Sequence, residues 1–217
     1  NKNLDFPRGY HIEYGGRMSM PSYGFESGIH TRNGKIPGRD GKPKQAGGFG
    51  ADLKDDYRRF FGTRVSMAGR GTAIARKENY CEIDPNVVDK YGIPVLRFNY
   101  TWANEEIKQA KHMQDTFQAI MHEMGAIVTS TPHGPENNYG LEAPGRIIHE
   151  VGTTRMGDDP KKSALNRWCQ AHDCNNLFVV DAAPFVQQGD KNATWTILAL
   201  SLRTAEYMLE QRKKLNI

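Results

Sequence analysis

The sequence lacks several features that define broad classes of protein. No apolar run is long enough for a transmembrane helix, and no secretory signal opens the chain. The net charge of +4 is small and its positive residues are scattered, so nucleic-acid binding is not predicted. Hydrophobic residues make up 38% and charged residues 25% of the chain, which is typical of a soluble globular protein.

Cysteine is scarce. An odd set of three, Cys81, Cys169 and Cys174, in 217 residues does not indicate a disulfide framework. The segment CQAHDC brings Cys169, His172 and Cys174 close in sequence, but a zinc site usually takes four ligands and no second pair is evident. We therefore predict no metal site and expect ordinary thiols. Metal analysis would test the zinc alternative.

The chain also lacks an initiator methionine and begins NKNLDFPRGY. We interpret this start as the result of processing or of excision from a longer protein. Targeting information is then lost with the missing part, and the sequence leaves the compartment open between periplasm and cytoplasm.

The first 70 residues are irregular and rich in glycine. Residues 34–50 predict a long loop, since glycine and proline punctuate this stretch. A strand-like pattern at residues 10–20 precedes the loop, and a short helix with an acidic start is expected at 51–62.

The middle of the chain predicts a sheet with a long helix. Apolar side chains recur near helical spacing from residue 104 to 125, with Asn104 as N-cap and Gly125 as the stop. Alternating apolar and polar residues, and short apolar runs, predict antiparallel strands at 63–69, 79–85, 94–100, 126–130 and 145–151.

The pattern changes after residue 150. A continuous apolar run at 175–185 predicts a strand buried on both faces. Residues 192–215 predict a long helix, capped by Asn192 or Thr194 and basic at its C-terminal end. Apolar residues almost encircle the first turns of this helix, which indicates burial in a body larger than one sheet.

Three ordered blocks carry a family resemblance. They are HEVGTTRMGDDP at 149–160, NNLFVVDAAPF at 175–185 and DKNATWTILALSLRTAEYM at 190–208. In this order they resemble the C-terminal end of the glucose-methanol-choline (GMC) flavin oxidoreductases, whose pattern runs roughly H-x-x-G-T-x-R-M-G, N-L-x-V-x-D-x-S and N-P-x-x-T-x-x-A-L-A-x-R. Residues 79–100 also resemble the substrate-domain hairpin of that family, so the clear match covers about residues 78 to 213.

The resemblance implies an α+β fold with two parts. Residues 1–150 are expected to form a substrate-binding domain, an antiparallel sheet with flanking helices whose N-terminal third is rich in loops. Residues 151–217 are expected to return to an FAD-binding α/β domain and to supply its last strand and helix.

The same resemblance exposes an absence. Family members bind FAD through an N-terminal G-x-G-x-x-G turn, and AGRGTA at 68–73 lacks the third glycine and the βαβ context. We therefore expect FAD as cofactor, an N-terminal FAD-binding domain as partner, and no activity from this chain alone.

The resemblance also implies a catalytic pair. His149 aligns with the family's catalytic histidine, and a neutral imidazole suits proton removal from an alcohol because its ordinary pKa lies near working pH. Asn192 occupies the place of a second polar residue, histidine or asparagine, which orients the substrate oxygen. Here "NA" replaces the usual "NP" at this position, and no needed functional group is lost.

Four further residues are implied at the flavin. Asp181 and Ala182 resemble the residues near the ribityl chain, although "DAAPF" departs modestly from the family pattern. Ala193 and Thr194 open the last helix, whose N-terminal amides would face the flavin pyrimidine ring. A helix N-terminus carries about half a positive charge and stabilises the anion formed on reduction.

The substrate class follows from the same resemblance. Residues 181–203 are most similar to the bacterial branch that includes gluconate and glucoside dehydrogenases, which implies a sugar, glycoside or sugar acid. A cytochrome or quinone often accepts electrons in that branch instead of oxygen. Family membership alone does not fix substrate or acceptor.

Structural alternatives stay open for these residues. His149 could be a core histidine, Asn192 a helix cap and Asp181 a cap of the strand or helix. Arg155 is expected to lock its turn through an ion pair, and Tyr139 to rim a substrate pocket or lie in a surface loop. The chain as a whole could be a non-enzymatic binding or scaffold module without flavin, and an isolated fragment is expected to form homo-oligomers.

Overall fold

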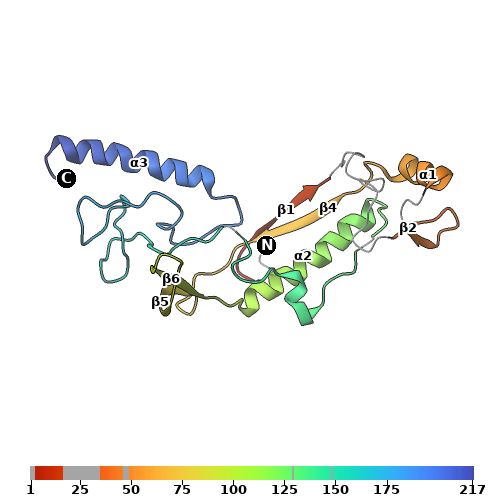
Figure 1. Cartoon of the computed structure of the whole chain (residues 1–217), viewed down its shortest axis with the longest axis horizontal. Helices are drawn as coiled ribbons and strands as arrows, with labels where there is room; N and C mark the ends of the chain where they lie inside the picture. The colour runs from red at the N-terminus through yellow and green to blue at the C-terminus, as the bar shows by residue number, and fades with distance from the viewer. Residues whose placement is uncertain (1–2, 17–34, 46–48, 129, 148) are drawn as a thin grey trace. The chain divides into compact units, whose positions relative to one another are not determined.

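The computed structural model describes residues 3–16, 35–45, 49–128, 130–147 and 149–217. Figure 1 follows the described elements along the chain. In order they are β1 (Tyr10–Gly15), β2 (Lys35–Pro37), β3 (Pro43–Gln45), α1 (Gly50–Phe60), β4 (Ser66–Gly71), β5 (Tyr80–Val88), β6 (Pro94–Asn99), α2 (Asn104–Glu123), the 3-10 helix η2 (Pro135–Gly140) and α3 (Thr194–Lys213).

The fold is mixed α+β, as predicted, but its strands form small sheets. Among the described residues β1 pairs with β4, β2 with β3 and β5 with β6, each as a two-stranded sheet. The last two pairs are antiparallel. In the described part of the chain, three separate two-stranded sheets therefore take the place of the single antiparallel substrate-domain sheet that was predicted.

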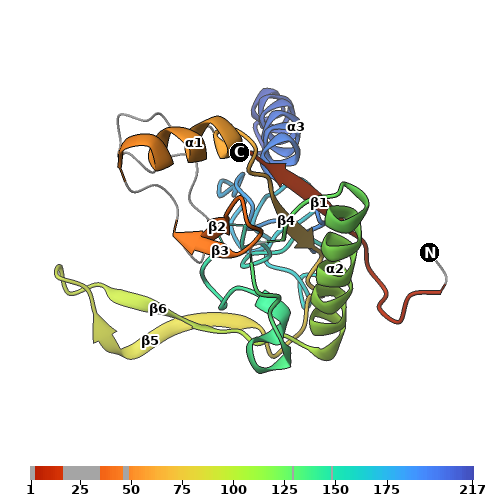
Figure 2. The same ribbon diagram turned by 90° about the vertical axis from the view of Figure 1, so that its right-hand side faces the viewer.

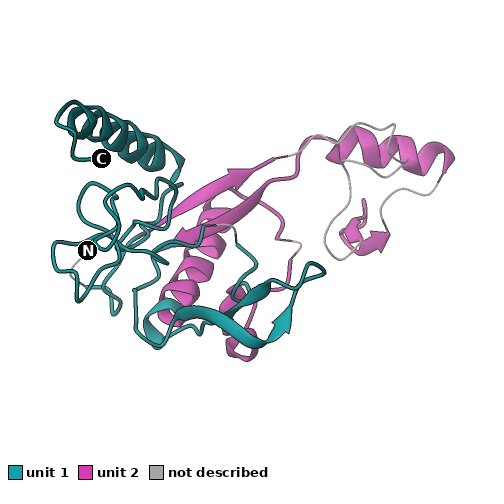
Figure 3. Cartoon of the chain, turned by 60° about the vertical axis from the view of Figure 1, so that its left-hand side comes forward, with its two compact units in different colours: residues 1–9, 71–106, 142–217 teal, residues 10–70, 107–141 magenta. Residues whose placement is uncertain are grey.

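The chain divides into two compact units, coloured separately in Figure 3. The first unit comprises residues 1–9, 71–106 and 142–217, and the second comprises 10–70 and 107–141. All residues predicted for catalysis and for FAD belong to the first unit. The predicted domain boundary at residue 150 remains a prediction.

Part of the predicted loop at 34–50 is a hairpin with its own small core. Strands β2 and β3 pair across a turn in which the Gly38 N–H donates to the Lys42 carbonyl at 2.8 Å. Ile36 is buried, and the side chains that pack against it come mainly from α1: Leu53, Tyr57, Phe60 and Phe61. Buried Asp56 on α1 also pairs with Lys44 of β3 at 2.7 Å.

Helix α2 has the predicted extent, within two residues at its end. Its start is closed by Glu106, whose carboxylate accepts from the Ala103 N–H at 2.7 Å, so the predicted Asn104 cap is wrong by one residue. Gly125 follows the helix with φ of 66°, as expected of a glycine stop. In the second unit, a Cβ on Gly69 of β4 would overlap Met113 of α2, so the glycine permits close packing.

The hairpin of β5 and β6 confirms the two strands predicted there, and Figure 2 shows it as a long ribbon. Ile83 stands opposite Leu96, and Glu82 pairs with Arg97 across the strands. At the tip, the Asp89 carboxylate accepts from the Tyr91 and Ile93 N–H groups.

Three predicted strands are wrong. The described residues of 126–130 and 145–151 form no strand, and residues 129 and 148 lie outside the described part. The apolar run 175–185 forms only an isolated bridge at Phe178. The apolar content of 175–185 predicted a strand buried in a sheet, but this run is shared between two segments: the Val179 N–H donates to the Cys169 carbonyl, and the carbonyls of residues 182–184 accept from residues 152–156.

The predicted C-terminal helix is confirmed as α3, drawn in blue in Figure 1. One face packs on residues 165–180 of the first unit: Thr204 is fully buried, and the Tyr207 ring stacks on Trp168 at 4.9 Å. The other face carries a stripe of exposed apolar side chains at helical spacing: Trp195, Leu198, Leu202 and Leu209.

Candidate active site

The segment that follows His149 is held along one edge by residues 182–184. The N–H groups of Gly152, Thr154 and Met156 donate to the carbonyl oxygens of Ala182, Ala183 and Pro184 at 3.4, 3.2 and 2.8 Å. The donors are every second residue of 152–156, and the acceptors are three consecutive residues. The pairing thus joins the first two sequence blocks directly.

The other edge of the same segment is held by residues 164 and 165. The Gly157 N–H donates to the Leu165 carbonyl at 2.8 Å, and the Ala164 N–H donates to the Arg155 carbonyl at 3.2 Å. The Leu165 side chain is almost completely buried. Residues 152–157 are therefore fixed on both sides.

Gly152 is required by this arrangement. Its φ is 86°, a left-handed conformation that other residues adopt only with strain. A Cβ at this position would also lie 3.2 Å from the Phe185 carbonyl oxygen. The glycine lets the two segments approach each other.

Arg155 locks the turn, as predicted, but through a different partner. Its guanidinium Nη2 donates to the Lys162 carbonyl oxygen at 2.6 Å, and no ion pair of Arg155 occurs among the described residues. A guanidinium has several N–H donors and can therefore hydrogen-bond to a carbonyl oxygen in a turn.

His149 is half-buried and lies in irregular backbone directly before exposed Glu150. The start of its segment is anchored by Trp102, whose indole Nε1–H donates to the Glu142 carbonyl at 2.9 Å. This contact could not be predicted from the sequence, because nothing in local periodicity links residue 102 to residue 142.

Asp181 and Ala182 lie beside the motif segment. Asp181 is exposed, and its Oδ1 accepts from the Ala183 N–H at 2.7 Å, which forms a local turn. The Ala182 carbonyl is the acceptor for Gly152. The backbone thus brings two of the four predicted flavin residues next to the block that contains His149.

The start of α3 carries the other predicted residues. Ala193 is the N-cap and is buried, but its side chain supplies no capping hydrogen bond. The predicted cap at Asn192 or Thr194 is therefore wrong, and both residues are exposed. Among the described residues, no hydrogen bond joins His149 to Asn192, the predicted catalytic pair.

Comparison with known proteins identifies the family. The sequence pattern of the GMC oxidoreductases matches residues 75–201, more than half of the chain. This chain belongs to the GMC oxidoreductase family. The matched range contains all of the predicted catalytic and flavin residues of this GMC chain.

Relatives of this GMC chain include sugar and alcohol dehydrogenases. It is 29% identical to the gluconate 2-dehydrogenase flavoprotein of Pantoea cypripedii, over 94% of this chain and 32% of the relative. It is 31% identical to the 2-methyl-1,2-propanediol dehydrogenase of Mycolicibacterium austroafricanum, over 74% and 29% respectively. It is 28% identical to the fructose dehydrogenase large subunit of Gluconobacter japonicus, over 80% and 30%. The chain spans about a third of the length of these curated relatives.

The segment with Cys169, His172 and Cys174 does not form part of the candidate site. Cys169 is buried, Cys174 is exposed, and the His172 Nε2 is hydrogen-bonded to the Ser163 hydroxyl at 3.0 Å. Across the described residues, no group of three or more histidine, cysteine, aspartate or glutamate side chains is arranged to hold a metal ion.

No described helix combines the length and apolar character needed to cross a membrane.

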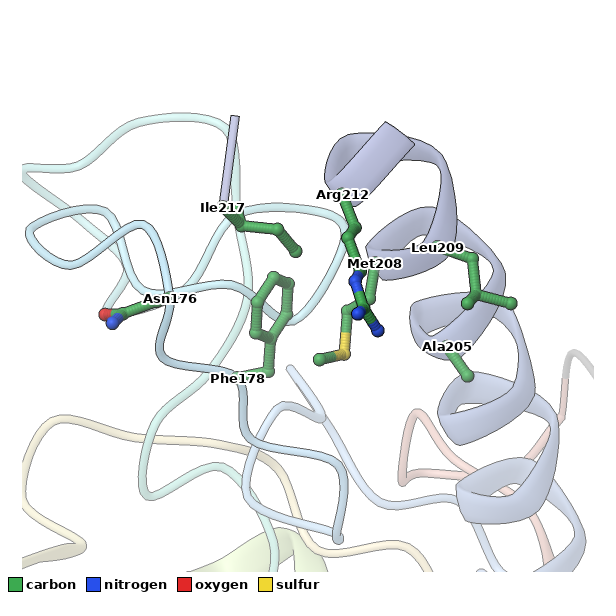
Figure 4. A pocket seen from close by; sticks show the side chains of 7 residues that line it. All are labelled: Asn176, Phe178, Ala205, Met208, Leu209, Arg212 and Ile217. Carbon is green, nitrogen blue, oxygen red and sulfur yellow. The ribbon is translucent and has the colours of Figure 1, made fainter. Parts of the chain in front are cut away.

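A pocket of about 500 Å³ lies beside the last turns of α3 (Figure 4). Its lining includes Phe178, Met208, Arg212 and Ile217. Residue 205, the first helical residue in the lining, lies about 16 Å along the helix from Thr194, given a rise of 1.5 Å per residue. The pocket is therefore separate from the N-terminal end of α3, where the flavin residues are predicted.

Proposed function

We propose that this chain is the C-terminal part of an FAD-dependent oxidoreductase that acts on the CH–OH group of a sugar, glycoside or sugar acid. The observation that carries the proposal is the backbone pairing of Gly152, Thr154 and Met156 with Ala182, Ala183 and Pro184. This pairing unites two blocks of the family pattern, and the second block leads into α3.

His149 would act as the base. A half-buried imidazole in a backbone fixed on its C-terminal side can accept the proton of the substrate hydroxyl. Asn192 would orient the same oxygen, since its amide offers both donors and an acceptor. The alcohol is then placed to lose its proton to His149 as its carbon gives up a hydride.

The residues at the start of α3 fit a flavin. Thr194, Trp195 and Thr196 form the first turn, and Ala193 gives their N–H groups no side-chain cap, which leaves donors for an acceptor on a ligand. Ala182 and Ala193 are small, and exposed Asp181 directly precedes Ala182. The flavin, when bound, supplies the hydride acceptor, while these residues would bind and orient it.

The exposed apolar stripe on α3 supports the proposal that this chain is part of a larger protein. Trp195 is 83% and Leu202 63% exposed, an unusual state for large apolar side chains on a 20-residue helix. We infer that an N-terminal FAD-binding domain covers this stripe in the longer protein. In its absence, the stripe would favour association of the fragment with itself.

The names of the relatives support a sugar or sugar acid as the substrate class, and they do not name an electron acceptor. Two of the three relatives described above are named for gluconate and fructose, which are polyhydroxylated, and the third is named for a small diol. A sugar or sugar acid is therefore the proposed substrate, and a quinone or cytochrome the proposed electron acceptor.

The first test is the visible absorbance spectrum, recorded for this chain and for the longer protein that contains it. We expect flavin bands and oxidation of sugars only with the longer protein, because this chain lacks a G-x-G-x-x-G turn. A longer protein that binds no FAD and oxidises no alcohol would contradict the proposal and favour a binding or scaffold role.

A further inference from the structure

Two aromatic residues follow strand β6 in the same compact unit as His149. The backbone between them is held firmly: the Arg76 guanidinium donates to the Thr101 carbonyl at 2.6 Å. The side chain of Asn79 also accepts from the Thr101 N–H at 3.0 Å and donates to its carbonyl at 3.3 Å. The backbone between Tyr100 and Trp102 is therefore held at both the N–H and the carbonyl of Thr101.

This aromatic pair contacts the chain at Glu142, upstream of His149. The Tyr100 and Trp102 rings contact each other edge to face, with centroids 5.2 Å apart and an interplanar angle of 78°. The Trp102 indole donates to the carbonyl of Glu142, at the start of residues 142–150. Trp102 thus joins the Tyr100 ring to the chain at Glu142, upstream of the candidate base His149.

The pKa of Tyr100 is raised. Burial raises the pKa of Tyr100, and the carboxylate of Glu106 raises this pKa further, against an opposing effect of Arg76. The carboxylate of Glu150, the neighbour of His149, also raises the pKa of Tyr100. The hydroxyl is therefore protonated near neutral pH and remains both donor and acceptor.

We propose that Tyr100 is a substrate-contacting specificity residue. Its ring would pack against the C–H face of a polyhydroxylated substrate, and its hydroxyl would bond to a substrate hydroxyl other than the one oxidised. A tyrosine suits this role because it combines a rigid apolar body with a polar end at low entropic cost. The inference rests on the proposed function, since it concerns the substrate of the same site.

The test uses the longer, flavin-loaded protein with the variant Tyr100→Phe and the control Tyr91→Phe. Tyr91 lies at the exposed tip of the β5–β6 hairpin, so the control removes a hydroxyl remote from the anchored pair. KM and kcat are measured for the best sugar and for its set of monodeoxy analogues.

We expect Tyr100→Phe to raise KM for the sugar about 2- to 12-fold, the effect of losing one neutral hydrogen bond, with kcat nearly unchanged. One monodeoxy analogue should lose this difference between wild type and variant, which identifies the hydroxyl that Tyr100 contacts. Tyr91→Phe should match the wild type for every substrate.

Other outcomes overturn the inference. An unchanged KM, an equal loss for the sugar and all analogues, or loss of bound flavin from Tyr100→Phe would assign Tyr100 a structural role. A wild-type protein that oxidises no alcohol would contradict the proposed function itself. An active wild type with an unaffected variant would contradict only the role of Tyr100.

Discussion

The backbone N–H of Met156 donates to the carbonyl oxygen of Pro184 at 2.8 Å. This bond joins the block that follows His149 to the block that leads into α3. Gly152 and Thr154 donate in the same way to Ala182 and Ala183, so three backbone hydrogen bonds align the two blocks. Changes in this backbone should therefore affect both the stability of the first unit and the candidate site.

Replacement of Gly152 by alanine should lower the free energy of unfolding. A left-handed residue other than glycine costs about 1–2 kcal/mol, and the new Cβ would also crowd the Phe185 carbonyl. Chemical denaturation of Gly152→Ala measures the loss. Gly189→Ala is the matched control, because no atom lies within 4 Å of its Cβ position, and equal losses in the two variants would refute the argument.

Replacement of His149 by alanine should slow flavin reduction in the longer protein. A general base contributes on the order of 10²–10⁴-fold, so the rate of anaerobic flavin reduction by substrate should fall within that range. Bound flavin should remain at wild-type content. His122→Ala, on an exposed side chain near the end of α2, should leave the rate unchanged. A His149→Ala rate equal to that of the wild type would rule out the proposed base.

Loss of the Tyr207 ring should weaken the attachment of α3. This ring stacks on Trp168 at 4.9 Å, and its hydroxyl donates to Gln170 at 3.3 Å. An aromatic pair contributes about 0.5–1.5 kcal/mol beyond the area that it buries, so Tyr207→Ala should cost at least this much. Urea denaturation gives the difference, and exposed Glu206→Ala is the control. A cost no larger than the control's would show that the stack does not stabilise the helix.

The pair of Asp158 and Arg167 should make a small, pH-dependent contribution to stability. The Arg167 guanidinium donates two bonds to the carboxylate, at 2.9 and 2.8 Å, and holds the pKa of Asp158 below its ordinary value. The stabilisation is present above the ordinary aspartate pKa and is lost as pH falls through the lowered pKa.

Arg167→Met should therefore be less stable than the wild type near neutral pH and equal to it in acid, as measured by thermal unfolding across pH. Both side chains are largely exposed, so added salt should reduce the difference. A difference that persists unchanged in strong acid would assign the effect to packing of the arginine stem instead.

The exposed stripe of α3 should cause self-association of this chain on its own. Leu198 and Leu202 lie one turn apart on the stripe, so the double variant Leu198→Gln and Leu202→Gln should reduce both the mass seen by light scattering and the binding of an apolar dye. In the longer protein the same variant should weaken the attachment of the rest of the molecule. A wild-type chain that is monomeric and binds no dye would contradict this account.

Much of the fold could be predicted from local patterns. Helices α1, α2 and α3 and strands β5 and β6 follow the expected periodicities, because their apolar residues recur at the spacing of one face. The sequence could not distinguish the run 175–185 from a buried strand. The Val179 N–H donates to the Cys169 carbonyl, while the carbonyls of residues 182–184 accept from residues 152–156. Local periodicity does not indicate that one run will bond to two different segments.

Part of the candidate site could also be predicted from the sequence, and part could not. The motif around His149, together with the blocks at 175–185 and 190–208, was enough to identify the family, since residue types at fixed spacing carry that information. The contact of Trp102 with Glu142 and the position of Tyr100 could not be anticipated. They depend on residues remote in sequence, and nothing in the identity of residue 100 or 102 indicates which carbonyl or carboxylate it will meet.

The sequence by itself determined the helices, the hairpin and the membership of the GMC family, because periodicity and motif spacing are properties of neighbouring residues. Only the tertiary structure decided that Met156 pairs with Pro184, that Arg155 holds a carbonyl instead of a carboxylate, and that α3 leaves an apolar stripe exposed. Those outcomes depend on which distant backbone groups satisfy one another, and a linear pattern does not specify such partners.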